Sequence, residues 1–514
     1  MALSYAQRLA LALLFSQAAT CLEVSISQAA PSAAASISPS FLSFSIEQDR
    51  WTDWVGTTSR NDFFFNTLDN LRQLTGEPPQ IRIGANSEDH TDFSPNVKAA
   101  IFPAVTATVP YPEATNITVG DGFYAAAKFL PPNTHVIWGL NLGQNNVTAA
   151  FLEAKSLVKA FASSDITGAG IVLDAIEIGN EADLYKNNGL RASSYSSTQY
   201  VKEWTTFATN VTAGVKAAIG TAPKFWGAAF AGSSHSITGF SPQAIFSEGV
   251  LSSAAGAAIT TISEHRYSGS FCAGSGGLLQ DLMTKSTIRS NLTQFSPDIT
   301  ATHAKGLSFG APGVSNTAGA AIWTLDYLLF ASQLGIERVF FHEGIGFKYN
   351  LIQPITLTRS ILDGSTLATP LPPHIQPQYY AAIIASEAIG SSGNTRVIEL
   401  TFNDTRVSGY AFYEGTSLAR AVIINSQAFF TTSNASSRGT KHIDLNLSGS
   451  KPPTSMTVKR FSIPHADDTT GLRWAGQTYE TSDGRVSGTV AMDKTPVSNG
   501  VDIQDTEAVM LSFT

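Results

Sequence analysis

Apolar and polar residues follow a strand–helix rhythm along most of the chain. Runs that alternate at two-residue spacing, or are continuously apolar, predict strands, and apolar residues at three- and four-residue spacing predict helices. The predicted strands span 41–47, 80–84, 135–140, 173–179, 224–230, 258–264 and 338–343. The predicted helices span 61–74, 149–162, 198–219, 277–292, 315–334 and 378–389. This alternation is typical of a parallel sheet, and over 41–390 it predicts an α/β fold, a (β/α)8 TIM barrel.

One strand of this barrel is not evident in the sequence. Between the helices that end at 292 and begin at 315, no apolar or β-branched run is long enough to cross a barrel. Only 306–309 has the pattern of a short strand. We therefore expect a truncated seventh strand, so that the sheet either leaves a gap or closes through a few residues.

The pattern changes after residue 390, where short alternating strands replace the strand–helix units. Turns rich in Gly, Ser, Asn and Asp separate these strands, and no helical period is present. The strands are predicted at 396–402, 408–413, 419–425, 442–447, 456–463 and 508–513. They predict a C-terminal antiparallel β-sandwich domain over 391–514. The Ser- and Ala-rich segment 21–40 is either a linker or one loose strand.

The N-terminal residues have the pattern of a secretory signal peptide. Arg8 precedes the apolar run 9–15, small residues follow to residue 20, and the run is too short to span a bilayer. Since no later stretch is long and apolar, we expect 1–20 to be removed and the protein to be secreted, without a membrane segment. Seven Asn-x-Ser/Thr triplets favour a secreted glycoprotein. They lie at Asn116, Asn146, Asn210, Asn291, Asn403, Asn434 and Asn446.

Composition narrows the classes of partner and cofactor. Charged residues make up 14% of the chain and the net charge is −8. No cluster of Lys and Arg is present, which argues against nucleic acid as a partner. The only cysteines are Cys21 and Cys272, so we expect neither a disulfide framework nor a cysteine-based metal site.

The segment 176–181 carries the clearest candidate chemistry. A buried strand is predicted to end at Gly179, and Asn180 and Glu181 follow it. Active sites of parallel barrels are built at the C-terminal ends of the strands. A carboxylic acid at that position, beside an amide that can hold a sugar hydroxyl, suits the acid/base of a glycosidase. From these residues alone, Glu181 is equally well explained as a loop carboxylate or a helix N-cap.

Short motifs over nearly the whole chain carry a family resemblance. They are Phe-Ser-Ile-Glu at 44–47, Arg-Ile-Gly-Ala-Asn-Ser-Glu-Asp at 82–89, Trp-Gly-Leu-Asn-Leu at 138–142, Ile-Gly-Asn-Glu at 178–181, Gly-Ala-Pro-Gly-Val-Ser-Asn-Thr-Ala at 310–318, Phe-His-Glu-Gly-Ile-Gly at 341–346 and Trp-Ala-Gly-Gln-Thr-Tyr at 474–479. In this order they resemble glycoside hydrolase family 79, the β-glucuronidase and heparanase family, and particularly its secreted fungal β-glucuronidase-like members. The resemblance implies a barrel with a β-sandwich beside it, to which the N-terminal segment often adds a strand. It also implies retaining hydrolysis of terminal β-linked glucuronic acid, without metal or cofactor.

Under this resemblance Glu181 is the acid/base, and Asn180 contacts the 2-hydroxyl of the sugar. The nucleophile has no counterpart. The family places a Glu in a Gly-Glu-Thr-Asn-Ser-like motif at the end of the seventh strand, and this chain lacks that motif at 305–310. No carboxylate occurs between residues 298 and 326, where the strand count is also short. Glu343, at the end of the last predicted strand, is the nearest but a weak substitute.

Further polar residues near strand ends are candidates for substrate contact. They are Glu47 after the first strand, Asn86, Ser87 and Asp89 after the second, Tyr267 after the sixth and Tyr349 after the last. The structural alternatives are a buried carboxylate for Glu47, turn formation for Asn86 and Ser87, and a solvated loop for Tyr349. The resemblance implies that a Tyr near the end of the sixth strand supports the nucleophile by hydrogen bonding; Tyr267 is the candidate for this role, and His265 is a weaker one. Glu177 is expected either to form a core salt bridge with Arg82 or to belong to the site.

Three interpretations follow for function. The chain is a hydrolase that releases terminal glucuronic acid from glycans or glycosides, or a catalytically inactive carbohydrate-binding relative. Alternatively, the sequence is the product of an incomplete gene model that skips coding bases near Leu307. A glycan or glycoside that contains glucuronic acid is the expected partner, and no sequence feature indicates an oligomeric state.

Overall fold

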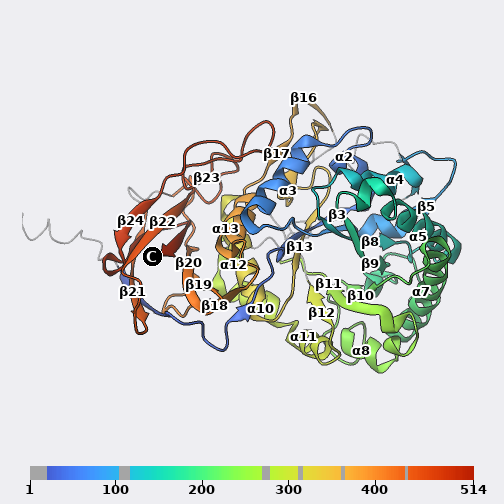
Figure 1. Ribbon diagram of the computed structural model, residues 1–514, viewed down its shortest axis with the longest axis horizontal. Coiled ribbons are helices and arrows are strands. Elements are labelled where there is room, and N and C mark those ends of the chain that lie inside the picture. Colours follow the sequence, from blue (N-terminus) through green and yellow to red (C-terminus); the bar gives the residue numbers. More distant parts are fainter. Residues whose placement is uncertain (1–19, 103–115, 269–277, 311–316, 361–364, 434–437) are drawn as a thin grey trace, which may run out of the picture.

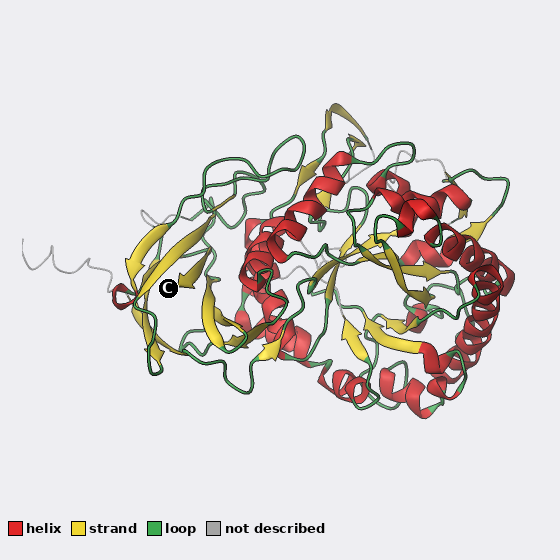
Figure 2. Ribbon diagram, viewed as in Figure 1, coloured by secondary structure: helices red, strands yellow, loops and turns green. Residues whose placement is uncertain are grey.

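The computed structural model describes residues 20–102, 116–268, 278–310, 317–360, 365–433 and 438–514. A helix-ringed barrel lies beside a smaller β-rich unit, formed mainly by the C-terminal part of the chain (Figures 1 and 2). Residues 1–19 of the predicted signal peptide, Cys272, Asn434 and most of the motif at 310–318 lie outside this description. Within it, every helix is too short or too polar to cross a bilayer.

Eight parallel strands form the barrel sheet. They are β3 (Leu42–Glu47), β4 (Ile81–Gly84), β8 (His135–Leu140), β9 (Val172–Ile178), β10 (Phe225–Phe230), β11 (Ile259–Glu264), β12 (Ser308–Gly310) and β13 (Val339–Glu343). Their order in the sheet is β12-β11-β10-β9-β8-β4-β3-β13, so neighbours in sequence are neighbours in space. The helices that surround them include α2 (Trp51–Val55), α3 (Asp62–Thr75), α4 (Asp121–Ala125), α5 (Val147–Phe161), α6 (Ser164–Thr167), α7 (Ser197–Ile219), α8 (Pro242–Ser247), α9 (Leu279–Met283), α10 (Lys285–Thr293), α11 (Ser296–His303), α12 (Ala318–Gln333) and α13 (Gln378–Ile389). The predicted α/β barrel is confirmed.

The seventh strand, β12, has only 3 residues and overlaps the predicted 306–309. It pairs with β11 along its whole length. It reaches β13 through one isolated parallel bridge between Gly310 and Arg338, beside a 3.0 Å hydrogen bond from the Glu337 N–H to the Phe309 carbonyl. The barrel is therefore nearly closed, and its closure depends on a few backbone contacts at this position.

Several elements differ from the predicted pattern. The helix expected at 277–292 is divided into α9 and α10, and α11 was not expected. A helix-start signal was present in Ser296 followed by Pro297, because proline is favoured in the first helical turn. Helix α12 is capped by Thr317, whose side chain accepts the Ala320 N–H. A small sheet of β5 (Thr91–Phe93), β6 (Ala100–Ile101) and β7 (Ile117–Val119) was also missed.

The C-terminal unit consists of two sheets. The larger contains β2 (Ala35–Ser36), β18 (Thr395–Glu399), β19 (Val407–Glu414), β20 (Ser417–Asn425), β26 (Glu507–Phe513), β22 (Ser455–Ser462), β23 (Arg473–Trp474) and β24 (Asp493–Pro496), all antiparallel. The smaller contains β1 (Thr20–Ser27), β21 (Thr440–Ser448) and β25 (Val501–Gln504), with β1 parallel to β21. Alternate residues of β19 and β20 face two cores: Val407, Ala411 and Ile423 lie in the core between the sheets, and Tyr410, Phe412 and Val422 lie in the core shared with the barrel. The antiparallel C-terminal domain is confirmed.

Helices α12 and α13 lie between the barrel and the large sheet (Figure 1). Both are almost completely buried, which explains why their sequences are apolar all round. One buried acid on α12, Asp326, joins the two units, since it accepts hydrogen bonds from Tyr410 at 2.5 Å and Ser408 at 2.9 Å and lies 3.2 Å from Arg289. The barrel and the C-terminal domain thus share one hydrophobic core.

The predicted glycosylation sites differ in exposure. Asn116, Asn146, Asn210, Asn403 and Asn446 lie at the surface. Asn291 is buried, and its Oδ1 accepts a 2.7 Å hydrogen bond from Arg266, so this residue is poorly placed to carry a glycan. The sequence triplet alone does not distinguish it from the other sites, because burial depends on how α10 packs.

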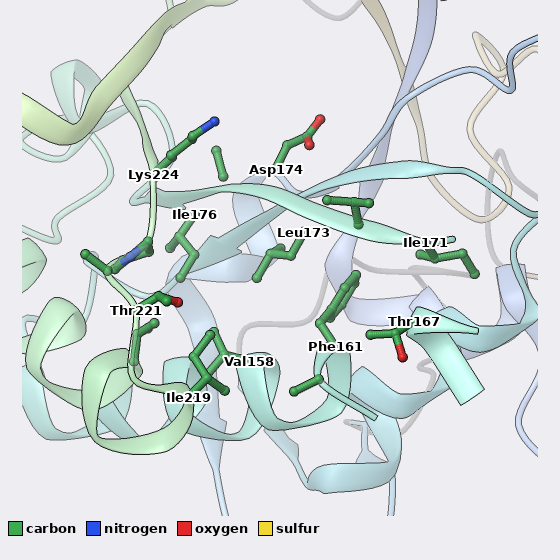
Figure 3. A pocket seen from close by; sticks show the side chains of 16 residues that line it. Val158, Phe161, Thr167, Ile171, Leu173, Asp174, Ile176, Ile219, Thr221 and Lys224 are labelled. Atoms are coloured by element: carbon green, nitrogen blue, oxygen red, sulfur yellow. The ribbon is translucent and has the colours of Figure 1, made fainter. Parts of the chain in front are cut away.

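A cavity of about 410 Å³ lies between the first half of β9 and helices α5 and α7 (Figure 3). It exists because β10 pairs with β9 only from Ile176 onward. Figure 3 shows Leu173 and Ile176 directed from β9 towards Val158 on α5, whereas Asp174 and Lys224 point away from the aliphatic lining. This end of the barrel therefore offers an apolar space without acid/base groups directed into it.

Candidate active site

The barrel interior changes from apolar to polar towards the C-terminal ends of its strands. Alternate residues of a strand point to the same face of a sheet. One apolar layer consists of Ile137, Ala175, Trp226 and Phe340. Two residues further along their strands, Ala175 is followed by Glu177 and Phe340 by His342. The sequence alternation thus places ionisable side chains in the layer just above a closed apolar floor.

A cavity of about 170 Å³ opens above this polar layer. It is lined by Ser45, Glu47, Arg82, Ala85, Asn86, Asn180, Glu181, His265, Tyr267 and His342. These residues come from the C-terminal ends of β3, β4, β9, β11 and β13 or from the loops that follow them. This is the end of a parallel barrel at which active sites are built.

Glu181 is held at the cavity by an unusual backbone turn. Its φ and ψ are 51° and 47°, in the left-handed region that non-glycine residues rarely adopt and that is enriched at functional sites. Its N–H donates to the Ala229 carbonyl at 2.7 Å, which ties the turn to the end of β10. Its Oε1 lies 2.9 Å from Nδ1 of His265, and 22% of the side chain is exposed. The carboxylate is therefore fixed but accessible.

The surroundings of Glu181 favour its ionised form. Burial raises the pKa of Glu181, but the hydrogen bond and charge of His265, together with the charges of His342 and Arg82, outweigh burial and hold the pKa below its ordinary value. In a retaining glycosidase a second carboxylate close to the acid has the opposite effect, because two like charges disfavour joint ionisation. The direction of this shift shows that cationic neighbours dominate the electrostatics around Glu181.

Arg82 connects the strands beneath the cavity. Its guanidinium is almost fully buried and donates to Glu177 at 2.6 Å, to Ser45 at 2.9 Å and to Asn180 Oδ1 at 2.9 Å. The sequence allowed either a core salt bridge between Glu177 and Arg82 or a site role for Glu177; the structure shows the salt bridge, and Glu177 does not line the cavity. Because the guanidinium holds Oδ1 of Asn180, the amide Nδ2 group is the one left to face a ligand.

A second buried network surrounds Glu47. Its Oε1 accepts hydrogen bonds from the backbone N–H of Ser87, at 2.6 Å, and from the Ser87 hydroxyl. Its Oε2 lies 3.3 Å from Nε2 of His342, and the imidazole stacks on Tyr349 with ring centroids 5.9 Å apart. The ring of Tyr349 also packs against Tyr267, with centroids 6.3 Å apart. These contacts form the wall of the cavity on the β13 side.

Comparison with known proteins shows which family the chain is similar to. The domain profile described as the glycosyl hydrolase family 79 C-terminal beta domain matches residues 409–510. A β-glucuronidase of Aspergillus niger is 29% identical over 472 residues, which cover 85% of this chain and 82% of that protein. The chain is similar to members of glycoside hydrolase family 79.

Further relatives agree with this chain in length and architecture. A β-glucuronidase of Neurospora crassa is 25% identical over 511 residues, 89% of this chain and 87% of that protein. The solved structure of a 4-O-α-L-rhamnosyl-β-D-glucuronidase from Fusarium oxysporum, in complex with Rha-GlcA, superposes with a TM-score of 0.76 at 22% identity. The match covers 96% of this chain and all of that one, which shows a common fold. The relatives thus support a glycoside hydrolase of glucuronidase type.

The structure brings together most of the residues singled out in the sequence. Glu181, Asn180, Glu47, Asn86 and Tyr267 all line the cavity. Tyr349 stands just behind its wall, in contact with Tyr267 and His342. Ser87 and Asp89 do not line it, because both are completely buried and bonded to other parts of the barrel.

Asp89 connects the loops that follow three neighbouring strands. Its Oδ1 accepts the N–H groups of Leu142 and Gly143, and its Oδ2 accepts the Asn180 N–H and the Tyr185 hydroxyl. Burial raises its pKa to about 6, although these four donors favour the carboxylate. The expected substrate contact is therefore replaced by a positioning role, in which Asp89 fixes the backbone of Asn180 beside Glu181.

Replacing Asp89 by Asn should destabilise the protein strongly. One oxygen that accepts two hydrogen bonds becomes an amino group that accepts none, so buried donors are left facing a donor. A loss of about 2–4 kcal/mol in the free energy of unfolding is expected, measured by urea unfolding. The matched control is Asp174→Asn on the same barrel, whose carboxylate is 33% exposed and pairs with His135. Equal losses in the two variants would contradict this role.

The structure places Glu343 outside the cavity. It follows His342 on β13, so it points to the opposite face of the sheet. It is completely buried there, and its carboxylate accepts the backbone N–H groups of Leu351 and Ile352. Burial raises the pKa of Glu343 well above its ordinary value despite these two donors. The substitute nucleophile considered from the sequence is thus a structural carboxyl.

Four cavity residues were not assigned to the site from the sequence: Ser45, Arg82, Ala85 and His342. The alternation along β13 could have indicated His342. Residues two apart on a strand share a face, and Phe340 is an apolar residue of the barrel interior. The same alternation from Glu47 pointed to Ser45. His265, considered a weaker candidate than Tyr267, makes the direct contact with Glu181.

Proposed function

We propose that this chain is a secreted family 79 protein whose cavity binds a terminal β-linked glucuronic acid residue of a glycan or glycoside. In this proposal Glu181 protonates the oxygen of the leaving group from its protonated form, which a pH near or below its lowered pKa populates, and the Nδ2 group of Asn180 donates to the 2-hydroxyl. The observation that carries the proposal is the accessible carboxylate of Glu181 at the C-terminal mouth of the barrel, beside an amide whose orientation Arg82 fixes.

The polar lining of the cavity supports an acidic sugar as the ligand. The imidazoles of His265 and His342 and the guanidinium of Arg82 line the same space. Arg82 is paired with Glu177, and the imidazoles of His265 and His342 lie beside Glu181 and Glu47 and line the cavity from strand ends. A uronate carboxylate is well matched to this cationic side, and a single sugar suits a cavity of about 170 Å³.

We also propose that the attack step of retaining hydrolysis is lost in this chain. That mechanism needs two carboxyl groups about 5–5.5 Å apart, one as acid and one as nucleophile. The family position for the nucleophile is the end of the seventh strand, and β12 with the residues after it, up to Asp326, contains no carboxylate. Glu47, the other carboxylate among the cavity residues, is held by Ser87.

A second candidate function is carbohydrate binding without turnover. It is favoured because the cavity keeps the polar residues proposed to contact the sugar, whereas the nucleophile is missing. The two candidates make different predictions for the purified protein, because binding requires only the cavity, whereas retaining turnover requires both carboxylates.

Calorimetry and hydrolysis assays on the secreted protein test the proposal. Glucuronic acid should bind and glucose should not, because only the uronate carboxylate uses the cationic side. The variant Asn180→Ala should weaken binding, whereas Asn188→Ala, in an exposed loop, should not. Hydrolysis of para-nitrophenyl β-glucuronide should be slower than in a family member with both carboxylates by at least ~10³-fold. Absence of binding would refute the cavity assignment, and rapid hydrolysis would refute the loss of attack chemistry.

Sequencing the transcript across Leu307–Ser308 distinguishes a true loss from an incomplete gene sequence. Recovery of a Glu-containing segment would show that the natural protein has the nucleophile. An unbroken junction would show that the short β12 is genuine.

A further inference from the structure

A cluster of one imidazole and two carboxyl groups lies behind the candidate active site. Its members are His235, in the loop after β10; Glu264, the last residue of β11; and Asp298, in the first turn of α11. One ligand atom from each lies within 4.8 Å of the others. None of the three lines the glucuronate cavity, so this cluster is separate from the proposed catalytic function.

The cluster contains acceptor atoms that have no donor. Glu264 and Asp298 are completely buried. Among the described residues, no N–H group donates a hydrogen bond to either carboxylate oxygen of Glu264, whereas Asp298 interacts with the Gln243 side chain and with Glu264 itself. Burial and the neighbouring Asp298 raise the pKa of Glu264 well above its ordinary value. Unpaired buried charge is costly, so protons or a cation must balance these groups.

The orientation of His235 adds a third acceptor to the cluster. The amide of Gln294 donates from Nε2 to the Asn291 carbonyl at 2.6 Å, which directs its Oε1 towards Nε2 of His235 at 3.3 Å. An N–H on Nε2 satisfies that oxygen; a proton then lies between Nδ1 and the Asp298 carboxylate, and a bound cation would replace this proton and take the Nδ1 lone pair. This Nδ1 lies 2.5 Å from Oδ2 of Asp298, and the ring packs edge-on against Phe295. In metal sites, an imidazole is commonly fixed by such a bond from its other nitrogen.

We propose that His235, Glu264 and Asp298 bind a divalent transition-metal cation, with Zn²⁺ as the best match. One imidazole nitrogen and two carboxylate oxygens are zinc ligands, whereas Mg²⁺ and Ca²⁺ prefer oxygen alone. Two carboxylates and a neutral imidazole also balance the charge of one divalent ion. Ligands in a tetrahedral zinc site lie ~3.4 Å apart, so modest side-chain rotation from the present spacing completes the site.

The proposed ion joins the part of the barrel that is least regular. Glu264 adjoins His265, which contacts Glu181, and Asp298 begins the helix that leads into the 3-residue strand β12. A cation at this point connects the ends of β10 and β11 with α11. Its role is structural, because it holds the wall beside the short strand.

Zinc uptake by the full-length protein tests the proposal. After dialysis against EDTA, calorimetry with ZnCl2 should show about one site per chain, and Zn²⁺ should raise the unfolding temperature by a few degrees. Addition of Co²⁺ should produce the visible absorption of a four-coordinate site. Mg²⁺ and Ca²⁺ should not compete at equal concentration.

Variants locate the site. Glu264→Gln and His235→Asn should each abolish uptake, with folding verified by circular dichroism. The matched control His442→Ala removes an exposed His–Asp cluster in the C-terminal domain and should leave uptake unchanged. No uptake by the wild-type protein would show that protons alone balance the cluster, and loss of uptake in His442→Ala would place the ion elsewhere. Either result would overturn the proposal.

Discussion

Azide is expected to restore the release of para-nitrophenol from para-nitrophenyl β-glucuronide by this chain, by ~100-fold or more over the rate without azide. The family nucleophile has no counterpart at β12, and a small external anion can take its place. The azide nitrogen attacks the anomeric carbon from the α face while the bond to the phenolic oxygen breaks. The product is the α-glucuronosyl azide, which carries inverted configuration and is identified by NMR.

Glu181 has a defined part in this restored reaction. With a poor leaving group the oxygen needs a proton as the bond breaks, so Glu181→Gln should slow the restored reaction by ~10²–10⁴-fold. With para-nitrophenol, whose anion leaves readily, the same substitution should have little effect. Chloride at equal ionic strength is the matched salt control. Wild-type turnover that azide does not change, with retained configuration of the released sugar, would show that another residue already serves as nucleophile.

Replacing Arg82 by Met should lower the free energy of unfolding by about 3–5 kcal/mol, as is typical when one partner of a buried ion pair is removed. The guanidinium is the cationic centre among three buried glutamates: it bonds Glu177 at 2.6 Å, lies 3.6 Å from Glu88 and interacts electrostatically with Glu47. Glu88 is packed so closely against the neighbouring strand that a Cβ at Gly139 would lie 1.8 Å from its Oε2. Without Arg82, these acids remain buried without a counter-charge.

Urea unfolding measures this effect, and two further variants separate its causes. Arg60→Met removes an arginine whose side chain is 47% exposed and should change stability by no more than ~0.5 kcal/mol. The double variant Arg82→Met with Glu177→Gln should recover part of the lost stability. In this variant the negative charge of Glu177, which Arg82→Met alone leaves without a counter-charge, is also removed. If Arg82→Met and Arg60→Met have equal effects, the buried network does not contribute as described.

The barrel was predictable because its strands and helices carry strong local patterns. Buried strand segments such as 136–140 and 225–230 are continuously apolar, and long helices such as α7 repeat their apolar residues at helical spacing. Glu181 was predictable because the end of a barrel strand is a position with a known chemical use. Helix α11 was missed because it has few apolar positions. The start signal in its first turn was not sufficient by itself to predict a helix.

The roles of Asp89 and Glu343 could not be read from local pattern. Both carboxylates lie at or after the end of a barrel strand and both are buried, but Asp89 accepts N–H groups from loops far along the chain, whereas Glu343 accepts those of Leu351 and Ile352, 8 and 9 residues further on. For Glu343 the direction of the side chain follows from its parity with His342, which places it on the outer face of the sheet. For Asp89 the direction of the side chain depends on the backbone N–H groups that it accepts from loops about 50 and 90 residues further along the chain.

Local sequence was sufficient to establish two domains, a parallel barrel with a defective seventh strand, and an acid at the mouth of that barrel. These properties depend on side-chain periodicity and on residues close together in the chain. The folded structure alone decided that His265 and His342 give Glu181 a cationic environment, that Arg82 orients Asn180, and that His235, Glu264 and Asp298 meet behind the site. Such groupings depend on which strands become neighbours and how far each extends, and long-range packing sets both.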